Sequence, residues 1–128
     1  ELIETDKPFN YESLSDIYYG LNKKYYGPAV EHNRQIRYEW CRIPHFYRGF
    51  YVYKYATGIT SAICIADKIL KEGEPAVKRY KEFLSTGCSL DPVNELRIAG
   101  VDLETSAPFE TVAKIFKETL DELKELCK

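Results

Sequence analysis

The chain has 128 residues, of which 45% are hydrophobic and 30% charged, and its formal net charge at pH 7 is −2. This length suffices for one domain with a core, and the near-neutral charge gives no electrostatic reason to bind nucleic acid or an anionic membrane. No apolar run reaches the roughly 18–20 residues that cross a bilayer, and the acidic start ELIETDKPFN is unlike a signal peptide.

The first third of the chain predicts two helices. Asn10 is suited to cap a helix that begins near Tyr11, and YESLSDIYYGLNKKYYG repeats apolar and aromatic residues at helical spacing. Gly27, followed by proline, stops that helix. Residues 29–42 are compatible with a second helix, although their apolar positions are only partly in phase.

A long third helix is predicted from about Pro44 to Lys71. Pro44 suits a first turn, and apolar residues go most of the way round the helix, which is typical of burial on several sides. Such burial is hard to achieve within this chain, so we expect partner structure beyond it. Gly49 and Gly58 each cost about 1 kcal/mol relative to alanine and are expected to permit close approach of another backbone.

Three shorter helices are predicted in the remainder. Gly73 ends the long helix, and a helix over 74–87 follows. Asp91 is an N-cap before a short helix over 92–100, and Pro108 begins a last helix with apolar residues every three or four positions. Because no convincing strand alternation occurs, the predicted fold class is all-α.

The cysteines give no sign of a metal site. Cys41, Cys64, Cys88 and Cys127 are widely spaced, without a C-x-x-C or a Cys/His cluster, so a structural zinc site is disfavoured. Cys64 lies in the apolar stretch SAICIA and is expected in the core. Without a visible secretory signal, reduced thiols and a cytoplasmic location are expected. The chain starts at Glu1 and lacks methionine, so we expect a piece of a larger protein.

Tyrosines crowd around one histidine in RIPHFYRGFYVYKYATG. Within one helix, alternate residues point in different directions, so buried hydroxyls would each need a partner or a wet cavity. Tyr53, about two turns from His45, is the best aligned with it, whereas Tyr51 and Tyr55 form an i,i+4 pair on an adjacent face. Packing and ligand binding both explain this stretch, and the pattern alone leaves them open.

The same run resembles the C-terminal signature of oligoendopeptidase F, a thimet-oligopeptidase-like zinc peptidase. The resemblance extends upstream through YYGLNKKYYGPAVE and downstream through the patterns Y-x-x-F-L-x-x-G and P-x-x-x-L-x-x-A-G-V-D. It covers essentially the whole chain. It implies that residues 1–128 form a single helical C-terminal region of a larger, multi-helical zinc-peptidase catalytic domain.

The resemblance also implies an activity, which is hydrolysis of internal bonds of short peptides in an enclosed channel. The family's zinc is held by two histidines of H-E-x-x-H and a further glutamate. That motif is absent here and precedes this region in the family, so no metal ligand is expected in this chain. The implied partners are short peptide substrates and the remainder of the same polypeptide, and the isolated chain is expected to be inactive.

Site residues follow from the same resemblance. His45 matches the family's motif histidine, and the hydrogen-bond donor to the scissile carbonyl is expected among Tyr53, Tyr51 and Tyr55. Which tyrosine donates stays open. His32, in AVEHNRQ, matches no ligand of the family and is expected at the surface. The expected substrate-binding residues are Tyr47, Arg48, Gly49 and Gly58.

A different class of protein also fits these patterns. The chain would then be a freestanding, non-catalytic helical module whose aromatic groove binds a peptide or a protein. Its last helix, with a Leu/Phe stripe, would equally suit self-association.

Overall fold

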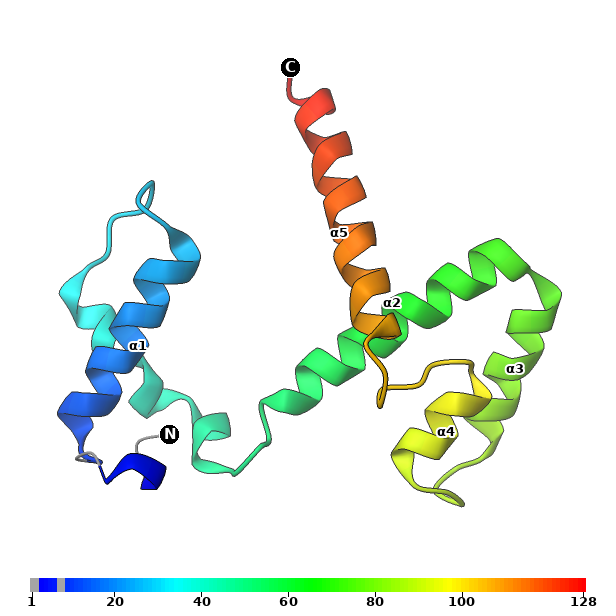
Figure 1. Cartoon of the computed structure of the whole chain (residues 1–128), viewed down its shortest axis with the longest axis horizontal. Coiled ribbons are helices and arrows are strands. Elements are labelled where there is room, and N and C mark those ends of the chain that lie inside the picture. The colour runs from blue at the N-terminus through cyan, green and yellow to red at the C-terminus, as the bar shows by residue number, and fades with distance from the viewer. Residues whose placement is uncertain (1–2, 7–8) are drawn as a thin grey trace. The chain divides into compact units, whose positions relative to one another are not determined.

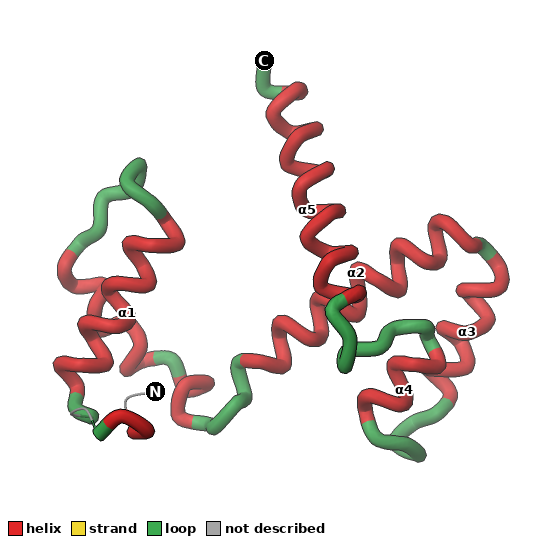
Figure 2. The backbone as a smooth tube through the Cα atoms, in the orientation of Figure 1, coloured by secondary structure: helices red, strands yellow, loops and turns green. Residues whose placement is uncertain are grey.

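The computed structural model describes residues 3–6 and 9–128, and all regular structure in these residues is helical (Figures 1 and 2). The predicted all-α class is therefore confirmed. The chain divides into two compact units, Glu1–Val52 and Tyr53–Lys128, which we call unit 1 and unit 2. Over the described residues, no helix combines the length and apolarity that crossing a membrane requires.

Unit 1 contains a short 3-10 helix, η1 (Ile3–Thr5), and the helix α1 (Tyr11–Tyr26). The predicted cap of α1 is confirmed, because the Asn10 Oδ1 accepts a hydrogen bond from the Ser13 backbone N–H at 2.9 Å. The Ser13 hydroxyl accepts in return from the Asn10 N–H at 3.2 Å, which completes a capping box.

The segment after α1 differs from its prediction. A 3-10 helix, η2 (Arg34–Arg42), replaces the predicted helix over 29–42, and Asn33 caps it. Packing of η2 on α1 buries the Ser15 side chain, whose hydroxyl accepts a hydrogen bond from Trp40 Nε1 at 3.0 Å.

The predicted unbroken helix from Pro44 to Lys71 is wrong. A short 3-10 helix, η3 (Pro44–Tyr47), comes first, and α2 (Tyr53–Glu72) begins only after a reverse turn. In that turn the Arg48 carbonyl accepts from the Tyr51 N–H at 3.2 Å. Phe50, at the third position of the turn, has φ of 59° and a side chain that is 97% exposed. A positive φ at this position belongs to a turn and breaks a helix.

Unit 2 consists of α2 and three further helices, as shown in Figure 1: α3 (Glu74–Ser85), α4 (Pro92–Ile98) and α5 (Ala107–Leu126). Both α3 and α5 pack on α2, and α4 packs on α3. These helices confirm the three predicted in this part of the chain, with bounds that differ by one or two residues.

One residue, Gly73, makes the corner between α2 and α3. Its N–H donates to the Ile69 carbonyl at 3.0 Å, and its own carbonyl accepts from the Ala76 N–H at 3.0 Å. Its φ of 69° lies in the left-handed region, which glycine enters without steric cost. The same residue therefore ends α2 and begins α3, and this places Ala76 in the core.

The core of unit 2 is small. Its buried hydrophobic side chains include Cys64, Ala76, Ala99 and Val101, of which Val101 is the most buried at 1% exposed. The Cys64 thiol donates to the Pro108 carbonyl at 3.4 Å, and burial raises the pKa of this thiol. The prediction that Cys64 is a core residue is confirmed.

The cap of α4 also follows the prediction. The Asp91 Oδ1 accepts from the backbone N–H groups of Val93 and Asn94, each at 3.1 Å. The Asn94 backbone N–H, followed by the Asn94 side chain, lowers the pKa of Asp91, because these donors stabilise the ionised carboxylate. Pro92 occupies the first turn, where a proline costs no hydrogen bond.

Candidate functional site

His45 lies in η3, directly after Pro44, and its side chain is half-buried. The reverse turn that follows brings Tyr51 back to it: the two ring centroids are 5.5 Å apart with an interplanar angle of 39°. The Tyr51 N–H to Arg48 carbonyl hydrogen bond holds this turn. The side chains of His45 and Tyr51 are therefore brought together by a turn and not by a shared helix face.

Arg48 completes this cluster. Its guanidinium carbon lies 5.5 Å from the centroid of the Tyr51 ring, within the range of a cation–π contact. Pro44, His45, Arg48 and Tyr51 line a cavity of about 200 Å³. An imidazole, a phenol and a guanidinium can each donate hydrogen bonds, so this cavity suits a carbonyl or carboxylate oxygen of a ligand.

The other side of η3 is apolar. The ring of Phe46 meets that of Tyr18 edge-on at 6.4 Å, and the hydroxyl of Tyr47 donates to the Cys41 carbonyl at 2.7 Å. Burial, and after it the Glu39 carboxylate, raises the pKa of Tyr18. A second cavity of about 360 Å³ lies here, lined by Phe9, Leu14, Ile17, Tyr18, Leu21, Trp40, Phe46 and Tyr47.

The remaining tyrosine candidates belong to unit 2. Tyr53 and Tyr55 lie in the first turn of α2, where their side chains are 64% and 57% exposed. The alignment of Tyr53 with His45 assumed a helix that continued through both residues. Because the chain turns at 48–51, that reason for preferring Tyr53 is wrong, although its hydroxyl stays a candidate donor.

The two glycines were expected to permit close approach of another backbone. Around Gly49 and Gly58, an added Cβ would meet no described atom within 4 Å. The space beside both glycines is therefore open, and the expectation that a backbone approaches them stays a prediction. Gly49 also lies inside the reverse turn that the Tyr51 N–H to Arg48 carbonyl hydrogen bond closes.

A zinc site is not formed by the part of the chain that the structure describes, in which no three or more His, Cys, Asp or Glu side chains are grouped to hold a metal. All four cysteines are free thiols, and only Cys64 of these is buried.

The expectation that His32 is a surface residue is wrong. His32 is half-buried, and its Nδ1 and Nε2 lie 2.9 Å from the Asn22 Oδ1 and the Gly27 carbonyl oxygen, respectively. The His32 carbonyl accepts in turn from the Tyr19 hydroxyl at 3.1 Å. His32 thus ties the segment after α1 back onto that helix, which gives it a structural function.

We expect His32→Ala to lower the free energy of unfolding of unit 1 by about 1–3 kcal/mol, because it leaves half-buried polar groups without their partner. The single tryptophan, Trp40, packs in unit 1, so its fluorescence during chemical denaturation measures this change. The control is Glu31→Ala at the neighbouring exposed position. Equal stability of the two variants would contradict a structural function for His32.

Comparison with known proteins shows what class of protein carries this arrangement. Residues 1–115 match Peptidase family M3, and the chain therefore belongs to this family. It is 48% identical over 120 residues to Oligopeptidase PepF of Bacillus subtilis, which covers 94% of this chain and 18% of that protein. It is 43% identical over 126 residues to an oligoendopeptidase F homolog of Borreliella burgdorferi, which covers 98% of this chain and 21% of that one.

The structural comparison agrees. The crystal structure of oligoendopeptidase-F from Enterococcus faecium matches 99% of this chain with a TM-score of 0.85 at 42% sequence identity. This chain covers 24% of that protein. The chain thus spans about a fifth to a quarter of the length of these relatives, and the resemblance to oligoendopeptidase F that the sequence suggested is confirmed.

Proposed function

We propose that this chain is the C-terminal part of the catalytic domain of an oligoendopeptidase that hydrolyses internal bonds of short peptides in the cytoplasm. The observation that carries this proposal is the match along 94–99% of the chain to proteins named oligopeptidase PepF and oligoendopeptidase F. In this proposal zinc is bound by residues outside the chain, and we derive no step of the reaction through it.

The contribution of this chain is hydrogen bonding to the peptide. When the scissile carbonyl is attacked, negative charge develops on its oxygen, and a donor aimed at that oxygen stabilises the transition state by roughly 3–4 kcal/mol. The His45 imidazole and a tyrosine hydroxyl are suited to this, since a phenol donates while it stays neutral near pH 7. The cavity shared by His45, Arg48 and Tyr51 supports Tyr51 as one donor, and Tyr53 and Tyr55 are the other candidates.

Substrate binding is assigned to Tyr47, Arg48, Gly49 and Gly58. The Arg48 guanidinium can pair with a carboxylate of a short peptide. Tyr47 offers an exposed ring, and its hydroxyl is held by a hydrogen bond to the Cys41 carbonyl. Gly49 and Gly58 leave open space in which a peptide backbone could approach.

The experiment that tests this proposal is product mapping with a full-length oligoendopeptidase that contains the chain. Short peptides of 6–12 residues, roughly, would be incubated with the protein and the products identified by mass spectrometry. We expect cleavage at internal bonds. Release of single terminal residues only, or binding of the peptides without cleavage, would contradict the proposal, and the second result would favour a non-catalytic peptide-binding module.

A further inference from the structure

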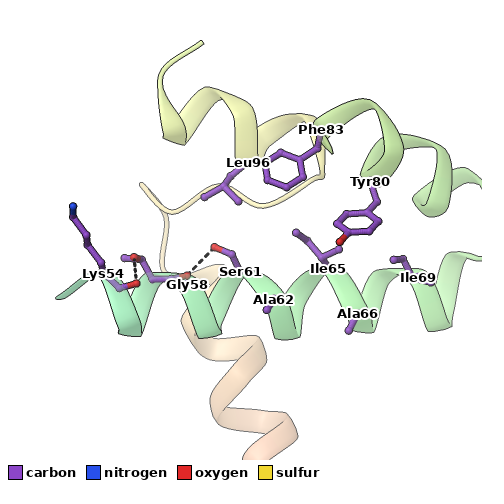
Figure 3. A pocket seen from close by; sticks show the side chains of 11 residues that line it. Lys54, Gly58, Ser61, Ala62, Ile65, Ala66, Ile69, Tyr80, Phe83 and Leu96 are labelled. Carbon is purple, nitrogen blue, oxygen red and sulfur yellow. Dashed lines mark hydrogen bonds between the residues drawn. The ribbon is translucent and has the colours of Figure 1, made fainter. Parts of the chain in front are cut away.

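A groove of about 490 Å³ lies along α2 within unit 2 (Figure 3). Figure 3 shows α2 on one side of this groove and side chains from α3 and α4 on the other. Its apolar lining includes Ala62, Ile65, Ala66 and Ile69 of α2, Phe83 of α3 and Leu96 of α4. We call it the α2 groove.

The α2 groove is shaped to receive a helix. Ala62 and Ala66 line it four residues apart, so they follow one another along a single face of α2. Small side chains on such a face allow the axis of a second helix to come close. Ala62 and Ala66 are exposed in this chain although neither has a polar atom to offer to water.

The groove is also part of a wider unburied surface on α2. Ile59 and Leu70, on the same helix, are exposed as well. The packing of α3 and α5 on α2 therefore leaves much of its apolar surface uncovered. Contiguous apolar surface of this kind marks an interface with another polypeptide segment.

We propose that the α2 groove binds an apolar helix from the remainder of the oligopeptidase polypeptide. The occupant follows from the length of chain outside this structure: the described fold corresponds to 24% of the Enterococcus faecium enzyme and the sequence to 18% of Bacillus subtilis PepF. This inference rests on the proposed function, because it takes the chain to be part of such an enzyme. The inference adds that the α2 groove is the surface of unit 2 that contacts the remainder of the polypeptide, and that a helix of the remainder lies in this groove.

The test is a chimera in which this chain replaces the matching segment of Bacillus subtilis PepF. Ala66→Glu would place a charge in the filled groove, and we expect it to lower the thermal midpoint of the chimera by roughly 5–10 °C. The matched control is Ala113→Glu on α5, which is also exposed and does not line the groove. We expect that substitution to shift the midpoint by less than about 2 °C.

The isolated chain supplies the second comparison. Because Ala66 is exposed there, Ala66→Glu is expected to leave its thermal midpoint unchanged within about 2 °C. Equal midpoints for Ala66→Glu and Ala113→Glu in a folded chimera would overturn the proposal. A dimer of the isolated chain that Ala66→Glu dissociates would also overturn it, since a second copy would then occupy the groove.

A direct binding measurement applies even if the chimera does not fold. The remainder of PepF, produced as a separate polypeptide, is expected to form a one-to-one complex with this chain, weakened at least tenfold by Ala66→Glu and not by Ala113→Glu. No complex in this mixture would overturn the proposal. Binding and thermal midpoints are measured without peptide hydrolysis, so loss of docking is distinguishable from failure of the proposed peptidase function.

Discussion

His45→Ala is expected to lower kcat/KM of the full-length oligoendopeptidase by about 10²–10³-fold, which corresponds to the loss of one donor to the developing oxyanion. The physical reason is that a preoriented imidazole N–H would stabilise the negative charge that develops on the carbonyl oxygen. Steady-state kinetics with a short quenched fluorescent peptide measure the effect. We expect kcat to fall while KM changes little.

Removal of one hydroxyl at a time identifies the second donor. Tyr51→Phe keeps the ring against His45 and under Arg48 and removes only the phenolic oxygen. We expect one of Tyr51→Phe, Tyr53→Phe and Tyr55→Phe to match the 10²–10³-fold loss of His45→Ala. The cavity shared with His45 puts Tyr51 first.

Two controls separate chemistry from folding. Circular dichroism and thermal midpoints should be the same for the enzyme and its variants, and His45→Gln, which keeps an N–H donor, should restore part of the activity lost in His45→Ala. A loss of less than about threefold in His45→Ala and in all three Tyr→Phe variants would contradict donation by this cluster.

The isolated chain is expected to hydrolyse no peptide. This loss of activity is larger than the one expected for His45→Ala in the full-length enzyme. Hydrogen-bond donors stabilise charge that develops on a carbonyl oxygen, but they do not supply the attacking group. Moreover, no cluster of potential metal ligands occurs in residues 3–6 and 9–128. The measurements are the zinc content of the purified chain and its turnover of a quenched fluorescent peptide, with the full-length enzyme as positive control.

Contaminating protease is the main source of error in that measurement. Turnover that persists through an additional chromatographic step and is abolished in the His45→Ala chain would contradict the prediction. Turnover that is equal in the chain and its His45→Ala variant would be assigned to the contaminant, and the purification would be repeated until it disappears.

Local signals predicted most of the helices. Asn10, Gly27, Asp91 and Pro108 mark helix ends by capping and by proline geometry, which act within a few residues and can be recognised without tertiary structure. The same holds for Gly73 at the end of α2. These ends were therefore correct to within one or two residues.

The break before α2 could not be predicted in this way. Residues 44–71 have the apolar content of a long helix, and a glycine such as Gly49 costs only about 1 kcal/mol in a helix. The left-handed Phe50 that breaks it carries no intrinsic preference for that conformation. Contacts between η3, the turn and the rest of unit 1 outweigh the local preference, and those contacts are not visible in the sequence.

The same unpredicted turn explains why the candidate site was predicted only in part. Sequence resemblance identified His45, and composition identified the tyrosines around it. The turn at 48–51 decides which ring lies against the imidazole, and it selects Tyr51. Periodicity on an assumed helix favoured Tyr53, because it could not account for a reversal of the chain direction.

The sequence also predicted the apolar faces of helices without the segments that cover them. Ile17 and Leu21 of α1 and Phe116 and Leu123 of α5 lie at the predicted helical spacing, yet all four are exposed. The spacing correctly identifies the face of each helix that is apolar. It does not say which polypeptide segment covers that face.

The glycine corner between α2 and α3 limits how the length of this region can vary. With only Gly73 between the two helices, one inserted or deleted residue would rotate α3 by about 100° about its axis. Ala76 would then face away from α2, and the larger side chain of Pro75 or Val77 would take its buried place. Insertions are far better tolerated between α3 and α4, where residues 86–91 form a connection of several residues. Evolutionary gains and losses of residues in unit 2 should accordingly gather there and leave the corner untouched.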